Sequence, residues 1–253
     1  MWIKKFLTPL IKGADYVTPI YERSRYEGST TNHFAFPIIY ATTGYPIRQP
    51  IAGDFAFNKK FIKIILSYDI NDSINRYGID IFMTYIACIN KLNIVQIMLD
   101  KKIHNPSYTK IENMFKEILN TMCFLLSNYY ENNFNSIFNV EDIKELPNCI
   151  LASRKFKHKD DAIRMNRHYK NKINYKTNIY SEWLKTLTYL ICNSQRIGTK
   201  EKEKIIDLFL LISTDFWLSS ENKSAIRCDA EIKERAIKLF YMIKGGNKYE
   251  DNN

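Results

Sequence analysis

The spacing of apolar residues along the chain predicts many helices and few strands. Gly13 and Gly44 each follow a helical run of apolar positions, where glycine commonly ends a helix, and Asn58 stands where a polar side chain can cap one. Residues 94–99 form a short, β-branched apolar run, which predicts a buried strand. The elements expected in the first half are a helix over 2–12, a strand over 15–21, helices over 30–43 (despite Pro37), over 58–66 and from 79 onward, the strand over 94–99 and a helix over 111–126.

Apolar residues keep a helical spacing after Gly78 and through the second half, and they are best interpreted as core contacts. The expected core positions after Gly78 are Ile79, Phe82, Met83, Ile86 and Ile89. Three later stripes comprise Trp183, Leu187, Leu190 and Ile191; Ile205, Leu208, Phe209, Ile212 and Phe216; and Ile232, Ala236, Leu239, Phe240 and Ile243. Residues 154–176 are dense in Lys, Arg and Asn, which predicts a solvated loop or exposed helix, with phosphate binding as the less favoured alternative.

Glycine and proline are concentrated near the start of the chain. Five of eight Gly and five of seven Pro fall within the first 80 residues, so the first part should be turn-rich and mixed and the rest helical. We predict an α/β (α+β) fold, with one domain over 1–134 and an all-α region over 135–253. The tail after residue 245 is expected to be disordered.

The composition, 253 residues with 45% apolar, is typical of a globular protein. No stretch approaches the ~18 uninterrupted apolar residues of a spanning helix, and the opening 12 residues are too interrupted by Lys for a signal peptide. The five cysteines lie at no metal-ligand or redox spacing, so we expect reduced, buried thiols. We therefore predict a cytoplasmic protein with no membrane span.

The net charge of +10 admits nucleic acid, membrane or phosphorylated ligands as partners. However, Lys outnumbers Arg 27 to 10 and Asn, Ile and Tyr are abundant, a combination typical of an AT-rich genome. The charge is also spread evenly, with a net +4 over 1–134 and +6 over the remainder. We therefore favour a solvated surface over a nucleic-acid surface.

Polar residues that could carry chemistry gather before residue 110, in the segments 21–23, 27–31, 48–54, 78–80 and 102–104. Each has a plain interpretation: Arg23 as a surface ion pair, Glu27-Gly28-Ser29 as a turn, Asp80 as a helix cap, and a lone histidine as structural. Only Gln49-Pro50-Ile51-Ala52-Gly53-Asp54 is too polar and too kinked for a core strand. The sequence contains no Gly-rich phosphate loop, zinc-type cluster or nucleophile elbow.

Taken in order, these segments resemble a known family. The segments are Tyr-Val-Thr-Pro-Ile-Tyr-Glu-Arg (16–23), Tyr-Glu-Gly-Ser-Thr-Thr-Asn (26–32), Ile-Arg-Gln-Pro-Ile-Ala-Gly-Asp-Phe (47–55), Tyr-Gly-Ile-Asp-Ile (77–81) and Lys-Lys-Ile-His (101–104). They are similar to the retaining glycosyltransferases of the glucosylglycerate and mannosylglycerate synthase type. The resemblance is specific over 14–115 and looser beyond, where Trp183 and residues 229–232 resemble the family's helical C-terminal region. It implies the C-terminal, acceptor-binding part of a GT-A fold.

The resemblance implies an acceptor site for a small carboxylate such as glycerate. Arg23 matches the family's carboxylate-binding arginine, a role that suits the bidentate donors of a guanidinium. Thr31 matches the threonine that shares this carboxylate, at a helix N-terminus where backbone N–H groups favour an anion. Gln49 and Gly53 would shape the floor of the site, Gly53 by permitting close backbone approach.

The resemblance also implies catalytic and metal-binding residues. Asp80 matches the family's active-site acid and would orient or polarise the reacting groups, and Asp54 is the second candidate catalytic carboxylate. His104 matches the histidine that completes the shell of a divalent cation, Mg²⁺ or Mn²⁺, whose other ligands come from an Asp-x-Asp motif. Lys101 and Lys102 could support the phosphates as point charges.

The sequence departs from the family in one respect. It holds no Asp-x-Asp, and it lacks the nucleotide-binding strands. We therefore expect the C-terminal part of an enzyme that transfers a hexose from a nucleotide sugar to a small carboxylate, with retention. The gene would be truncated, or the N-terminal half would be a separate polypeptide, and the chain would be inactive alone.

Two other interpretations stay open. The chain could be a non-catalytic remnant or partner subunit of such an enzyme, which keeps the acceptor pocket but not the chemistry. It could also be a basic, helical nucleic-acid-binding protein, an interpretation that rests on charge alone. In the favoured interpretation the chain binds no nucleic acid and forms a homo-oligomer through its helical region.

Overall fold

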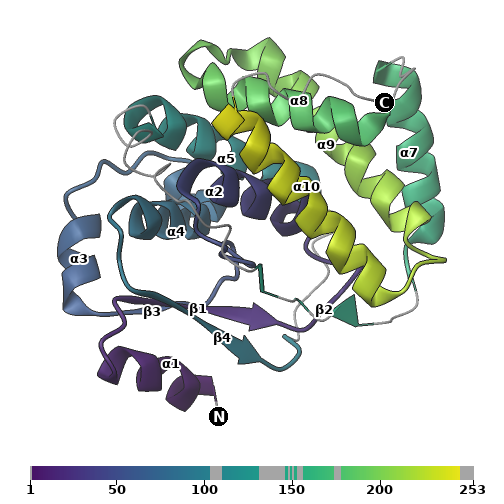
Figure 1. The fold of residues 1–253 in the computed structure, drawn as a ribbon. Coiled ribbons are helices and arrows are strands. Elements are labelled where there is room, and N and C mark those ends of the chain that lie inside the picture. Colours follow the sequence, from purple (N-terminus) through teal and green to yellow (C-terminus); the bar gives the residue numbers. More distant parts are fainter. Residues whose placement is uncertain are drawn as a thin grey trace.

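The protein, seen in a computed structural model, is a mixed α/β molecule that is mainly helical (Figure 1), as the apolar pattern predicts. The structure describes residues 2–102, 110–130, 146–147, 149, 151–152, 156–173 and 178–245. The elements are α1 (Trp2–Ile11), β1 (Tyr16–Tyr21), β2 (Arg23–Ser24), η1 (Thr31–Ala35), α2 (Phe36–Thr43), β3 (Ala56–Phe57), α3 (Lys59–Ile65), η2 (Ile74–Gly78), α4 (Ile79–Ile89), β4 (Ile94–Leu99), α5 (Ile111–Leu125), η4 (Leu126–Tyr130), β5 (Leu151–Ala152), α7 (Lys159–Ile173), α8 (Ile179–Cys192), η5 (Ser194–Arg196), α9 (Thr199–Ser219) and α10 (Ala225–Gly245).

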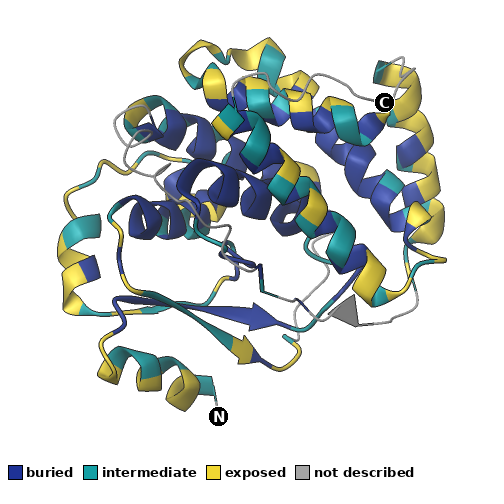
Figure 2. Ribbon diagram, in the orientation of Figure 1, coloured by how far each residue is buried: buried dark blue, intermediate teal, exposed yellow. Residues whose placement is uncertain are grey.

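A three-stranded sheet with the order β3-β1-β4 lies at one side of the molecule. β1 runs parallel to β4, in register from Tyr16–Ile94 to Tyr21–Leu99, and antiparallel to the short β3. Helix α1 lies under one face of the sheet, and α2 and α4 lie over the other (Figure 1). Every residue of β1 is buried as a result (Figure 2). β2 and β5 form a separate parallel pair.

The strand over 94–99 forms where the sequence predicts it, but the expectation that it is buried is wrong. Within the described part of the chain β4 pairs only with β1, so it is an edge strand, and five of its six residues are exposed or half-buried. The side chain of Met98 is 49% exposed. Lys5 of α1 partly covers this edge by donating a hydrogen bond to the carbonyl of Met98 at 3.3 Å.

The predicted helix ends are confirmed by their local geometry. Gly13 and Gly44 have φ values of 95° and 70°, the left-handed backbone that glycine adopts without steric strain. Asn58 caps α3 by accepting a hydrogen bond from the Phe61 N–H at 3.1 Å. Pro37 is tolerated because it lies in the first turn of α2, after the wide π-helical turn η1.

Helix α4 is buried more widely than its apolar pattern predicts. Phe82, Ile86 and Ile89 are buried as expected, whereas Ile79 and Met83 are only partly so. Polar and aromatic positions of α4 are buried as well; Thr84, for example, donates to the carbonyl of Pro50 at 2.8 Å. A helix packed between the sheet, α2, α3 and α5 has no wholly solvated face, so a single amphipathic stripe underestimates its core.

One hydrophobic core joins the two halves of the chain. It contains all three apolar stripes of the second half, and α10 packs along α2. The indole N–H of Trp183 in α8 donates to the His33 carbonyl at 2.7 Å. The predicted boundary at 134 and the tail after 245 lie outside the described residues, so both stay predictions.

Three smaller expectations can be compared with the structure. Helix α7 forms within the basic segment 154–176, and of its residues only Ala162 and Asn166 are buried. All five cysteines are free thiols; four of them are buried, whereas Cys192 is exposed, contrary to expectation. In the part of the chain that the structure describes, no helix combines the length and apolar character needed to cross a membrane.

Candidate functional site

Several predicted site residues meet around Tyr21, the last residue of β1. The chain leaves the sheet here and continues into β2, which carries Arg23. The loop between α2 and β3 passes beside it and brings Gln49, Gly53 and Asp54. Residues far apart in the sequence thus share the region beyond the C-terminal ends of β1 and β4, where polar side chains can be presented from loops on a rigid sheet.

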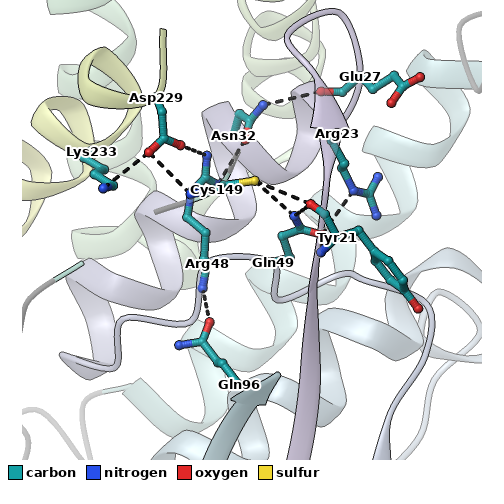
Figure 3. Close-up of polar contacts among 10 residues, drawn as sticks. All are labelled: Tyr21, Arg23, Glu27, Asn32, Arg48, Gln49, Gln96, Cys149, Asp229 and Lys233. Carbon is teal, nitrogen blue, oxygen red and sulfur yellow. Dashed lines mark hydrogen bonds and ion pairs between the residues drawn. The ribbon is translucent and has the colours of Figure 1, made fainter. Parts of the chain in front are cut away.

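Gln49 fixes the position of Arg23. The side chain of Gln49 is almost wholly buried, and its Oε1 accepts hydrogen bonds from Arg23 Nε at 3.1 Å and from the Tyr21 N–H at 3.3 Å. Its Nε2 donates to the Tyr21 carbonyl at 2.7 Å (Figure 3). Arg23 is half-buried, and within the described part of the chain its two terminal nitrogens hold no hydrogen bond. The guanidinium therefore keeps two parallel donors for an anion.

Asp54 is held by two partners, Tyr21 and Lys102. The Tyr21 hydroxyl donates to Asp54 Oδ2 at 2.6 Å, and Lys102 Nζ forms an ion pair with the same oxygen. Burial alone would raise the pKa of Asp54, but the hydrogen bonds from Lys102 and Tyr21 outweigh it and lower this pKa below its ordinary value. Asp54 is therefore charged near neutral pH, and its charge is compensated by Lys102.

Gly53 lies against this ion pair in the left-handed region, with φ of 82°. A Cβ atom at this position would lie 3.1 Å from Lys102 Nζ and 3.8 Å from Asp80 Oδ2. Glycine thus fits both the backbone conformation and the close approach of the two side chains.

Asp80 lies in the first turn of α4 and faces the same group of residues. Its carboxylate accepts a hydrogen bond from the backbone N–H of Gly53, and Asp54 and Lys102 are close enough to act on it electrostatically. Burial raises the pKa of Asp80 to about 6; the nearby charge of Lys102 and the Gly53 N–H oppose this rise, and Asp54 adds to it. The helix-cap interpretation therefore does not describe Asp80, because its carboxylate turns to another loop.

Thr31 and His104 are not brought into this group in the same way. Thr31 begins η1 and is buried, 2% exposed, whereas Gly28, three residues earlier, lies against the Arg23 side chain. His104 lies outside the described residues, so its predicted role stays a prediction. Among the residues that the structure does describe, no three His, Cys, Asp or Glu side chains are grouped so that they could hold a metal ion.

The described residues therefore do not fit a divalent-cation site by themselves. Asp54 is already paired with the ammonium of Lys102, which a cation would have to displace. Among these residues Arg23 offers hydrogen-bond donors and Asp80 offers an acceptor.

Four residues of the surrounding network were given no role by sequence reasoning. Asn32, Arg48, Cys149 and Asp229 connect the site to the C-terminal helix (Figure 3). Asn32, Arg48 and Asp229 lie in segments that carry the family resemblance, but neither the resemblance nor a local pattern indicates that Asp229 meets Arg48, which is 181 positions away. No local pattern could have paired them.

Comparison with models of known protein families gives no match, and neither does comparison with curated protein sequences.

Proposed function

We propose that this chain provides the acceptor site of a retaining glycosyltransferase, which transfers a hexose from a nucleotide sugar to a small carboxylate such as glycerate. One observation supports this proposal most: Arg23, Gln49, Gly53, Asp54 and Asp80 lie close together, although they span almost 60 positions. The glycosyltransferase assignment itself rests on the resemblance of the sequence motifs.

In this proposal Arg23 binds the acceptor carboxylate through its two terminal nitrogens. Gln49 holds Nε and so fixes the plane of the guanidinium before the ligand arrives. The shared role of Thr31 in binding this carboxylate rests on the resemblance alone, because Thr31 is buried and has no hydrogen bond to Arg23 in the described part of the chain. Fixing the donors in advance reduces the entropy lost on binding.

Asp80 then accepts a hydrogen bond from a hydroxyl group of the bound acceptor. With a pKa of about 6 it is mostly charged at neutral pH, and it is basic enough to polarise that hydroxyl group. The Lys102–Asp54 pair keeps an ammonium next to Asp80, which can compensate negative charge on a leaving phosphate. Asp80 orients and polarises in this scheme, and no covalent intermediate is required.

A divalent cation, Mg²⁺ or Mn²⁺, enters the proposal only through carboxylates of a donor-binding half together with His104. The same holds for the nucleotide sugar, because the described residues form no phosphate-binding loop. In this proposal the chain also forms a homo-oligomer through its helices.

The nucleic-acid alternative receives little support from the basic helix α7. Lys159, Arg164, Lys170 and Lys172 each pair with a carboxylate, and the partners of the first and last are Glu221 and Asp207. Paired cations release fewer counterions on binding a phosphate backbone, so they contribute less affinity. The remnant alternative keeps the same acceptor site and differs only in lacking turnover.

A transfer assay separates these possibilities. The chain is mixed with the donor-binding half of a related enzyme, a nucleotide hexose, Mg²⁺ and glycerate, and the hexosylglycerate formed is measured. We expect product only from the mixture. Arg23→Ala should raise the KM for glycerate, and His104→Ala should raise the KM for the nucleotide sugar. Equal, modest effects of both variants on both substrates would contradict the assigned roles.

A further inference from the structure

Arg48 is a charged residue with no exposed surface, placed directly beside the candidate site. Its Nη1 donates to Asn32 Oδ1 at 3.1 Å, and its Nη2 donates to Asp229 Oδ1 at 3.1 Å. Its guanidinium also lies over the ring of Phe36, 4.9 Å from the centroid. A buried cation is tolerated only with such partners, because its desolvation is otherwise too unfavourable.

Asp229 lies in α10, near the C-terminal end of the chain, and each of its two carboxylate oxygens has partners. Oδ1 accepts from Arg48, and Oδ2 contacts the backbone N–H of Cys149 at 3.5 Å and Lys233 Nζ at 3.3 Å. Asp229 is itself 6% exposed. The carboxylate thus joins α10 to the loop that follows α2 and to Cys149.

Two chains of contacts lead from this pair to Arg23 (Figure 3). In the first, Arg48 precedes Gln49, whose Oε1 accepts from Arg23 Nε and whose Nε2 lies 3.2 Å from Cys149 Sγ. In the second, Asn32 accepts from Arg48 and donates to the Glu27 carbonyl at 3.4 Å, next to Gly28, which lies against Arg23.

We propose that Asp229 is a positioning residue, through which helix α10 sets the orientation of the Arg23 guanidinium. The ion pair with Asp229 fixes the position of the Arg48 side chain. Arg48 in turn fixes Asn32 through a hydrogen bond and Gln49 as its neighbour in the chain. The role of Arg23 in binding a carboxylate rests on the proposed function, whereas the orientation of Arg23 does not. A displacement of α10 would therefore alter the anion site, although none of the proposed binding residues belongs to α10.

The alternative is that the Arg48–Asp229 pair only stabilises the fold. That role would lower the melting temperature on substitution but would leave the surroundings of Arg23 unchanged in the folded protein. A local probe of the Arg23 guanidinium distinguishes the two. The backbone of Arg23 also pairs with Leu151 of β5, which packs against α10, so the probe must report on the side chain and not on the backbone.

The experiment compares Asp229→Asn with Asp207→Asn in the full-length chain. Asp207 is a matched control, since it also forms an ion pair in the helical region, with Lys172, which lies outside the network around Arg23. The proteins carry ¹⁵N-arginine, and the Nε–Hε resonance of Arg23 is assigned from its loss in Arg23→Lys. Glycerate affinity is measured on the same samples.

In Asp229→Asn we expect the Arg23 resonance to shift or broaden and the Kd for glycerate to rise about tenfold, while Asp207→Asn changes neither. An unchanged Arg23 resonance in folded Asp229→Asn overturns the proposal. If Asp229→Asn does not fold, Asp229→Glu, which keeps the charge but moves it by a methylene, is measured by the same criterion. Failure of the wild-type chain to bind glycerate would count against the proposed function alone, since the resonance still tests the positioning role.

Discussion

Asp80 and Gly53 show at the residue scale how the candidate site differs from an ordinary surface. Asp80 has a pKa raised to about 6, chiefly by burial, so its charged form is disfavoured in the folded state. Gly53 brings the backbone close to Asp80 and Lys102 in a conformation that other residues adopt at a cost. The burial of Asp80 can be tested without knowing the substrate.

Asp80→Asn should change how stability depends on pH. A carboxyl group whose pKa is higher in the folded than in the unfolded state favours folding at low pH, and this contribution is lost as the pH rises through about 6. As the pH rises from 4 to 7, the unfolding free energy of the wild type should fall by on the order of 1–3 kcal/mol relative to that of Asp80→Asn. Urea unfolding across this range measures the difference. The exposed Asp72→Asn is the control, and parallel stability curves for wild type and Asp80→Asn would refute the burial of Asp80.

Gly53→Ala should disturb both the backbone and the site. The left-handed conformation should cost about 1–2 kcal/mol of stability with any Cβ, and the new methyl group would press on Lys102 Nζ. Gly13→Ala is a matched control, because Gly13 has φ of 95° but a Cβ there would have no neighbour within 4 Å. Thermal unfolding should show a comparable loss for both, whereas only Gly53→Ala should weaken glycerate binding. Weakened binding in Gly13→Ala would show that the effect is not local.

At the scale of elements, Gly78, the last residue of η2, sets how closely η2 and α5 approach. A Cβ on Gly78 would lie 1.9 Å from Thr121 Oγ1 and 2.5 Å from the Ser73 carbonyl, so the helices would have to move apart. Gly78→Ala should therefore destabilise the protein by about 1–3 kcal/mol, as overpacking of a core does. Gly198→Ala also makes a short contact, 2.9 Å, but with the flexible end of Glu201. The loss of unfolding free energy in Gly198→Ala, measured by denaturant unfolding, should stay near 1 kcal/mol or below. Equal losses in Gly78→Ala and Gly198→Ala would contradict this packing argument.

The elements show what a sequence can and cannot predict here. The ends of α1, α2 and α3 follow from Gly13, Gly44 and Asn58, because glycine and cap positions act within a few residues. The exposure of β4 could not be predicted, since an apolar run looks the same whether one strand or two pair with it. Likewise, the closeness of Gln49 and Arg23 was expected only through the family resemblance, and nothing local indicated that Asp229 would meet Arg48.

At the scale of the whole molecule, the shared core implies that the two halves depend on each other. Buried residues of α8, α9 and α10 pack with α2 and α5, and Arg25 donates to the Ser220 carbonyl at 2.7 Å. A chain ending at residue 134 should therefore lack a cooperative thermal transition, whereas the full chain should show one. Circular dichroism during heating makes the comparison, and a sharp transition in the shorter chain would support an independent domain over 1–134.

The claim that most needs a direct test is that Arg23 binds a small carboxylate. Isothermal titration of the full chain with glycerate, and with glycerol as the ligand that lacks the carboxylate, measures this. The account predicts that the wild type binds glycerate but not glycerol. Arg23→Gln should bind glycerate 10- to 150-fold more weakly, roughly the effect of losing 1.5–3 kcal/mol in a charge-assisted pair. The exposed control Arg167→Gln should bind glycerate as the wild type does. Equal affinity of the wild type and Arg23→Gln for glycerate would contradict the account.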